Sequence, residues 1–382
     1  MKRSKKIAMI VSVICILVGL CIMTAAWFRL RGTDPMELST IQYEETNHTI
    51  TEPFENIQIN TMNSSIEILP SDDGTCRIVC DDNEKLYHEV TAEKGTLSII
   101  QQDEWLWYET IGFGWSYEPT LTVYLPETEY STLNVTASSG NVTVAPGFRF
   151  QVTSIGTASG DVGLSELSTE YLYITSSSGD ISLRSVQAEL DMYLETVSGY
   201  LEAGDLAASD LTLASSSGDI VLENAAAERL GLSTVSGDIT VTGGSFSGTS
   251  YFETSSGYVE IRDSACGEQM LKTTSGDLTL RNVQNDTLNV SSSSGCLKLW
   301  DVICKGDFLF QMVSGDVAFS GADAACMDIM TSSGDVSGTL LTSKNFVTDT
   351  SSGYVEVPPS VESAGTCSIQ TVSGDIHIEI QP

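Results

Sequence analysis

Hydrophobic and polar residues alternate with period two on both sides of a Ser-Gly pair that recurs along most of the chain. The thirteen glycines lie at positions 140, 160, 179, 199, 218, 237, 257, 276, 295, 315, 334, 353 and 374. The residue two places after each glycine is Val, Ile or Leu, and the residue five places before it is apolar except for Thr348. This alternation predicts half-buried strands on either side of a tight corner.

The short period of the repeat selects the architecture. Successive glycines are 19 to 21 residues apart, which leaves no room for the helical crossovers that parallel strands otherwise need. A segment with Ile59, Ser64 and Ile66 fits the same template, with Ser64 in the glycine place. We therefore predict an all-β fold, a single parallel β-solenoid (β-helix) of about 14 coils over residues 56–382.

The two ends of the array differ from its middle. Residues 70–131 interrupt the repeat with strand-like runs at CRIVC, TLSII and LTVYL, and we interpret them as an antiparallel hairpin insertion that covers the N-terminal end. Regular coils then occupy residues 132–382. After Ile376, Ile378 and Ile380 no capping segment follows, which predicts an open edge available for end-to-end self-association.

The N-terminal segment predicts a membrane anchor. Residues 1–6 carry four basic side chains, and residues 7–28 contain no charge, a length that spans a bilayer as a helix. The excess of basic residues before this span predicts a single-pass protein of the cell membrane with a cytoplasmic N-terminus. Residues 29–55 would be a juxtamembrane linker to an extracellular solenoid. The alternative is a cleaved signal peptide ending near Thr24-Ala25-Ala26.

Charge and cysteine usage exclude several classes of function. The net charge is −33, and all 51 acidic residues lie after residue 33, so the domain should repel nucleic acid and anionic lipid. Seven cysteines follow the apolar span without a CxxC pair, and the three histidines lie in no recognisable motif. Neither a disulfide framework nor zinc is indicated, and we expect no cofactor.

The corner residues carry a structural interpretation. Glycine would supply a backbone conformation that other residues resist, and the small serine before it would fit the bend. A Thr or Ser three places before most of the glycines would bond a neighbouring hydroxyl or the corner backbone. No general base accompanies these serines, which argues against nucleophilic catalysis. Representative corners are Ser178-Gly179, Ser217-Gly218, Ser236-Gly237 and Ser275-Gly276.

Two sets of residues are candidates for binding. Carboxylates directly after the corner glycines could hold calcium where neighbouring coils pair them, although a turn-forming role is favoured; these are Asp161, Asp180, Asp219, Asp238, Asp316 and Asp335. An aromatic segment could contact a sugar, a peptide or a lipid headgroup, or plug the first coil; its members are Trp105, Trp107, Tyr108, Phe113, Trp115 and Tyr117.

The chain combines the N-terminal anchor, the early strand pair, the insertion, the YLPE segment Tyr124–Glu127 and the SGD-type coils. In this combination the sequence resembles a family of bacterial surface domains known as putative adhesins, whose function is unknown. The resemblance implies a β-solenoid ectodomain in the bacterial envelope without catalytic residues, sometimes linked to envelope stress. We expect a non-catalytic, adhesin-like binding or envelope scaffold module whose partner is an extracellular glycan, peptide or envelope protein. The alternatives are a polysaccharide-active β-helix enzyme and a self-associating structural rod.

Overall fold

The computed structural model describes residues 18–20, 24, 43–104 and 118–381. The chain divides into two compact units, residues 1–44 with 104–117 and residues 45–103 with 118–382. Most of the expected membrane span at 7–28 lies outside the described residues. Among those that are described, no helix has the length and apolar character needed to cross a membrane.

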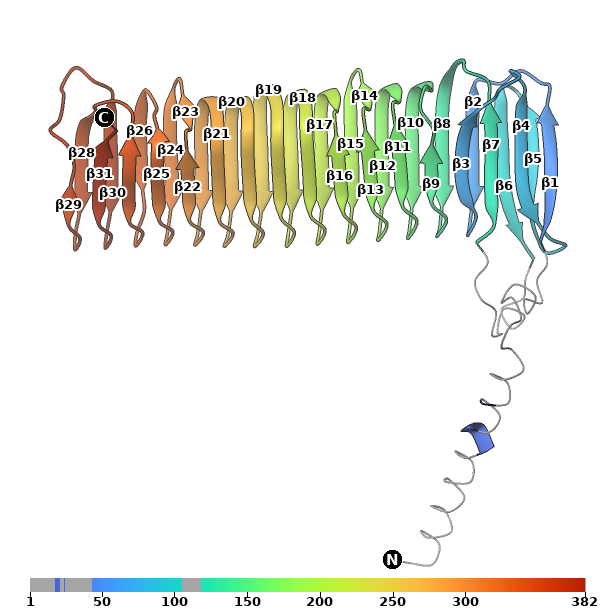
Figure 1. The fold of residues 1–382 in the computed structure, drawn as a ribbon, viewed down its shortest axis with the longest axis horizontal. Helices are drawn as coiled ribbons and strands as arrows, with labels where there is room; N and C mark the ends of the chain where they lie inside the picture. Colours follow the sequence, from blue (N-terminus) through green and yellow to red (C-terminus); the bar gives the residue numbers. More distant parts are fainter. Residues whose placement is uncertain (1–17, 21–23, 25–42, 105–117, 382) are drawn as a thin grey trace, which may run out of the picture. The chain divides into compact units, whose positions relative to one another are not determined.

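The second unit is an all-β parallel solenoid of about 12 turns (Figure 1). This is slightly fewer than the expected 14 coils. Each regular turn contributes one strand before the Ser-Gly corner and one after it, and each strand pairs in parallel with its counterparts in the neighbouring turns. For example, β10 pairs with both β8 and β12.

The pre-corner strands are β2 (Asn56–Thr61), β6 (Thr96–Asp103), β8 (Glu129–Ala137), β10 (Arg149–Thr157), β12 (Ser168–Ser176), β15 (Asp191–Thr196), β17 (Ala207–Ser215), β24 (Asp307–Met312), β26 (Cys326–Met330), β28 (Asn345–Thr350) and β30 (Thr366–Thr371). The post-corner strands are β3 (Ser65–Pro70), β7 (Thr120–Leu125), β9 (Val142–Val144), β11 (Val162–Ser165), β13 (Ile181–Arg184), β16 (Leu201–Gly204), β22 (Leu297–Trp300), β25 (Val317–Ala322), β27 (Val336–Leu340), β29 (Val355–Glu356) and β31 (Ile376–Ile380).

In the middle of the solenoid four long strands continue through the second turn of a coil. They are β18 (Ile220–Thr234), β19 (Ile239–Thr254), β20 (Val259–Thr273) and β21 (Leu278–Ser292), and the short strands β14 (Gln187–Ala188) and β23 (Ile303–Cys304) occupy the same place in neighbouring turns. Inward-facing residues of the pre-corner and post-corner strands fill the interior. The column two places after the glycines is at most 1 % exposed in every coil but one, which makes it a continuous apolar core.

The N-terminal end is built from strands of the 70–131 segment. β6 pairs in parallel with β2, and β7 with β3, so they add a turn beyond the first coil. β5 (Leu86–Glu93) then pairs antiparallel with β6, and β4 (Cys76–Asp82) antiparallel with β7. β1 (Glu44–Ile50) pairs with β4, although its residues were expected to be linker. We call β1, β4 and β5 the N-terminal cap.

The C-terminal end differs from the expected open edge. β30 and β31, the last strands in sequence, lie between the coil of β26–β27 and the coil of β28–β29 (Figure 1). The backbone amide of Asp375 therefore donates to Asp335 at 2.8 Å, and that of Tyr354 donates to Asp375 at 2.7 Å. The outermost coil is that of Gly353, where Val355 is 36 % exposed. The prediction that Ile376–Ile380 forms the free edge was wrong.

The true edge at β28 is partly covered by the segment that returns to β30. The Ser360 hydroxyl accepts from the amide of Phe346 at 3.0 Å and donates to its carbonyl at 3.3 Å, and the amide of Val361 donates to the Lys344 carbonyl. Pro358 and Pro359 follow the short β29 after one intervening residue, Val357. Because proline has no amide hydrogen, these residues limit further strand addition at this end.

Candidate functional site

The corner glycines stack directly on one another, and this contact is the reason for glycine there. A Cβ on Gly218 would lie 1.7 Å from the carbonyl oxygen of Gly199, and one on Gly179 would lie 1.9 Å from that of Gly160. The corner glycines do not have positive φ. The expectation of a special backbone conformation at this corner was therefore wrong, and the close approach of two backbones replaces it.

Left-handed backbone occurs instead in the second turn of many coils. Asp205, Asn224, Asp263 and Asn282 have φ between 51° and 56° there, and Gly243 takes the same place with φ 71°. Asp and Asn tolerate this region better than other non-glycine residues. Two of the amides also bond the preceding coil, since Asn282 donates to Asp263 at 2.6 Å.

The hydroxyl three places before the glycine bonds the corner backbone, which confirms that part of the prediction. Thr196 Oγ1 accepts from the amide of Gly199 at 3.0 Å and donates to the carbonyl of Gly179 in the preceding coil at 3.3 Å. Thr234 makes the same two bonds with its own corner and the preceding one. These buried hydroxyls link neighbouring coils and take no part in a catalytic arrangement.

The aspartates considered as calcium ligands form a hydrogen-bond ladder along the corner. Each Oδ1 accepts the amide of the equivalent residue in the next coil, as in Asp161 with Asp180 at 2.9 Å, Asp219 with Asp238 at 2.8 Å, and Asp316 with Asp335 at 2.9 Å. The ladder continues from Asp180 to the amide of Tyr200 and stops, because tyrosine offers no such acceptor. None of these carboxylates belongs to a cluster of three metal-ligating side chains within the described residues.

Exposed apolar side chains lie along the same corner edge. Val197, Val235, Val313 and Val372 stand two places before a glycine and are 47 to 57 % exposed. Tyr200, Tyr258 and Tyr354 follow a glycine directly; Tyr200 and Tyr354 are exposed, Tyr354 to 66 %, and Tyr258 is half-buried. We call these seven residues the corner ridge. Exposed apolar groups that repeat on one edge of a strongly acidic, rigid scaffold are typical of a contact surface.

A chain of buried polar groups joins the N-terminal cap to the first coil. His88 Nδ1 lies 2.6 Å from Asp82 Oδ1, and His88 Nε2 lies 3.2 Å from the hydroxyl of Ser64. Gln101 donates from its side-chain amide to the same hydroxyl at 2.7 Å, and its amide oxygen accepts from the backbone amide of Met62 at 2.6 Å. Ser64 stands in the corner column, since a Cβ on Gly140 would meet its carbonyl oxygen.

The order Asp82, His88, Ser64 is that of a serine-hydrolase triad. Ser64 is completely buried, however, and its hydroxyl already accepts a hydrogen bond from Gln101. A substrate carbonyl has no approach to this oxygen in the structure. The arrangement supports a structural role, in which Asp82 on β4 and His88 on β5 hold the cap against Ser64 in the first corner, between β2 and β3.

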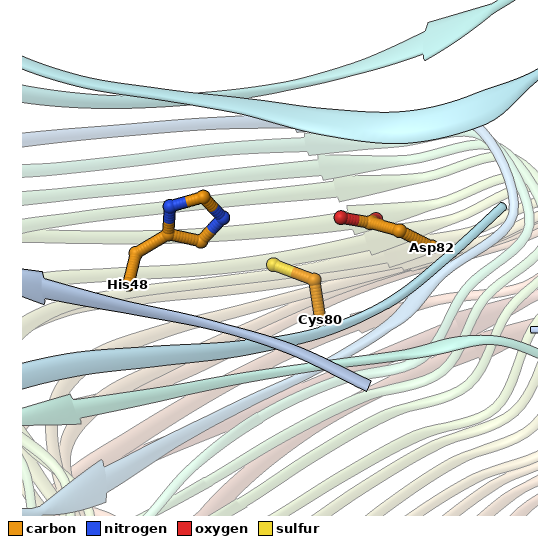
Figure 2. A group of neighbouring side chains, drawn as sticks. All are labelled: His48, Cys80 and Asp82. Atoms are coloured by element: carbon orange, nitrogen blue, oxygen red, sulfur yellow. The ribbon is translucent and has the colours of Figure 1, made fainter. Parts of the chain in front are cut away.

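Asp82 also takes part in a second cluster, with His48 on β1 and Cys80 on β4. Figure 2 shows the Cys80 sulfur between the His48 ring and the Asp82 carboxylate. One donor atom from each residue lies within 4.8 Å of the other two. His48 Nε2 is buried without a hydrogen-bond partner, an uncommon state for a ring nitrogen.

The protonation of this cluster follows from its surroundings. Burial, together with the nearby carboxylates of Asp82 and Asp81, raises the pKa of the Cys80 thiol to about 12. Burial also acts to raise the pKa of Asp82, but hydrogen bonds from His88 and Thr46 outweigh it and hold that pKa below its ordinary value. The cluster thus combines a thiol with an ionised carboxylate that is already oriented.

Sequence reasoning missed this cluster. Cys80 and Asp82 alternate on one strand and so share a face, which was a readable signal. His48 is distant in sequence and lies in a segment interpreted as linker, so no motif or ligand spacing along the sequence connects it with Cys80. The aromatic candidates Trp105, Trp107, Tyr108, Phe113, Trp115 and Tyr117 lie outside the described residues, and their role stays a prediction.

The chain belongs to the Toastrack DUF4097 family, whose model matches residues 54–261, 190–300 and 270–381. This is consistent with the resemblance to bacterial surface domains seen in the sequence. No curated protein matches the chain.

Several solved structures are similar to the chain at low identity. A putative adhesin from Parabacteroides distasonis shares 14 % identity over 78 % of this chain and 98 % of its own, with a TM-score of 0.30. A putative adhesin from Bacteroides fragilis shares 13 % identity over 89 % and 98 % of the two chains, with a TM-score of 0.22. A putative lipid binding protein from Parabacteroides distasonis shares 15 % identity over 79 % and 98 %, with a TM-score of 0.22.

Proposed function

We propose that the chain is a non-catalytic binding module, held at the outer face of a cell membrane by residues 7–28, that engages an extended glycan or peptide of the envelope or its surroundings. The observation that carries this proposal is the corner ridge. The corner hydroxyls and aspartates are used in bonds between coils, so the apolar side chains that this edge offers an external partner are the valines and tyrosines of the corner ridge.

The geometry of the ridge favours an elongated ligand. Neighbouring strands of a sheet lie about 4.8 Å apart, and the ridge residues recur every few coils along one straight edge. A polymer lying along this edge would meet several apolar contacts in succession. The adhesin names of the similar structures are in keeping with a binding role, and membrane attachment rests on the uncharged N-terminal run and the basic residues before it.

Binding of the full chain to envelope fractions and to glycan and peptide arrays tests the proposal. The triple variant Tyr200→Ser, Tyr258→Ser, Tyr354→Ser should weaken binding at least about tenfold, because buried aromatic contacts dominate such surfaces. Tyr173→Ser is the matched control, since Tyr173 is 38 % exposed but lies on β12, away from the ridge. Equal binding by the triple variant and the control would refute the ridge as the contact surface.

The two alternative functions make different predictions. An enzyme should turn over acidic polysaccharides or react at Ser64 with a serine-directed phosphonate probe, and we expect neither, because Ser64 is buried. A self-associating rod would have to use β28 and β29, where the return segment already bonds part of the edge. We therefore expect the Ile378→Lys change, which falls on the interior strand β31, to damage folding more than association.

A further inference from the structure

We propose that His48, Cys80 and Asp82 form a binding site for a divalent transition metal ion, and that zinc is the ion this donor set fits best. The three residues offer an imidazole nitrogen, a sulfur and a carboxylate oxygen, all within 4.8 Å of one another. Zinc binds these donors at about 2.0 to 2.3 Å in tetrahedral geometry, so the donor atoms would need to close by about 1 Å. A thiolate with an imidazole does not suit calcium or magnesium, which prefer oxygen ligands.

The unpartnered nitrogen of His48 is the first independent support. Buried polar atoms in folded proteins are nearly always bonded, and His48 Nε2 has no partner. A metal ion would satisfy this lone pair. The Cys80 thiol would give its proton to solvent as the bond from sulfur to metal forms, and the ion would exchange three of its water ligands for the three side chains.

The surroundings of Asp82 are the second support. Carboxylates that bind metal ions are usually held in place by further hydrogen bonds. Asp82 Oδ1 accepts from the ring and the backbone amide of His88, and Asp82 Oδ2 accepts from the hydroxyl of Thr46 at 2.5 Å. His88 is in turn fixed by Ser64, and Ser64 by Gln101. The otherwise unexplained polar chain thus orients one ligand of the site.

The position of the ligands indicates what the ion does. His48 belongs to β1 and the other two ligands to β4, so a bound ion would tie together two strands that are joined by a β-ladder and by the side chain of Thr46. β1 connects the solenoid to residues 1–43. Metal binding would clamp the cap strand through which the solenoid joins its N-terminal segment, and it leaves a fourth coordination position for water.

The experiment uses the full chain, stripped of metal with a chelator and titrated with zinc against a chromogenic competitor, and separately with cobalt to detect a thiolate-to-metal absorption band. We expect one zinc per chain and a cobalt band. His48→Gln and Cys80→Ser should each weaken zinc binding at least about 100-fold, and Cys80→Ser should abolish the band. Cys76→Ser is the matched control, because Cys76 is buried on the same strand but lies outside the cluster.

Each outcome decides the proposal. Zinc should slow amide exchange in β1 of the unchanged protein and of Cys76→Ser, but not of His48→Gln. If Cys80→Ser fails to fold, His48→Gln still tests the site. This variant is expected to fold, because His48 is only partly buried and lies on an edge strand. Zinc binding that survives both substitutions, or cobalt binding without a thiolate band, would place the ion elsewhere on the acidic surface and overturn the site.

Discussion

Replacing Gly218 with alanine tests why glycine occupies the corner column. The added Cβ would lie 1.7 Å from the Gly199 carbonyl oxygen, whereas real Cβ atoms stay at 3.0 Å or more, so the two coils must separate locally by about 1.3 Å. The amides of Ser217 and Leu201 bond across this junction, to Val197 and Asp219, at 3.0 Å each. A separation of that size breaks both bonds.

The expected cost combines two effects. Two lost hydrogen bonds contribute about 1 to 3 kcal/mol, and overpacking in a region that cannot relax freely adds about 1 to 3 kcal/mol. Gly218→Ala should therefore destabilise its coil by about 2 to 6 kcal/mol. Gly231→Ala is the matched control on the adjoining strand, because its Cβ would meet only the Thr212 side chain, at an ordinary 3.6 Å to Oγ1 and 3.9 Å to Cγ2. Loss of unfolded-state entropy should make this change neutral or slightly stabilising.

Hydrogen exchange resolved by peptide, together with urea unfolding, measures both variants. Since coils contact only their neighbours, protection should fall around Gly199 and Gly218 and remain unchanged near Gly140 and Gly353. A Gly218→Ala protein as stable as Gly231→Ala would show that close backbone contact is not the reason for glycine. Ser217→Ala should have a smaller effect, because the serine side chain is exposed.

Further predictions follow from the corner bonds, the cysteines and the C-terminal order. Thr234→Val should destabilise its coil by about 1 to 3 kcal/mol through two lost hydrogen bonds, measured by urea unfolding. Asp180→Asn should leave stability nearly unchanged, because an asparagine side-chain oxygen can accept the same backbone amide, as Asn141 does from Asp161. Asp180→Ala removes this acceptor and should speed amide hydrogen exchange nearby. Loss of stability in both variants would favour bound calcium. Iodoacetamide should modify the exposed Cys326 before the other described cysteines. Truncation before Thr366 should remove exchange protection from β28, and retained protection would mean that β28 pairs directly with β26.

Much of the solenoid could be predicted from the sequence because the relevant interactions are local and repeated. The period-two alternation identified strands on both sides of the corner, and the apolar column after each glycine is buried as expected, for instance at Ile181 and Ile220. The order of the last coils could not be predicted. Neighbouring coils present nearly the same pattern, so nothing local shows that β30 inserts between β26 and β28.

The candidate site was harder to predict for a different reason. His48 and Cys80 meet only because β1 adds to the edge of β4, a pairing without a periodic signal. The corner glycines were correctly identified as structural, but the sequence does not distinguish a left-handed turn from two backbones in contact. Only the position of the Gly199 carbonyl beside Gly218 separates these explanations.

The insertion of the last coil also has a consequence for the order of assembly. β28 and β29 emerge from the ribosome or translocation channel before β30 and β31, yet their pairing partners are those later strands. The growing solenoid can add each turn in sequence as far as β27. The next strands, β28 and β29, then have no pairing partners until β30 and β31 follow. The outermost coil closes only after residues 366–380 have entered the gap beside β26 and β27, so a chain cut short in its last coil would carry an unfinished end that a protease could recognise.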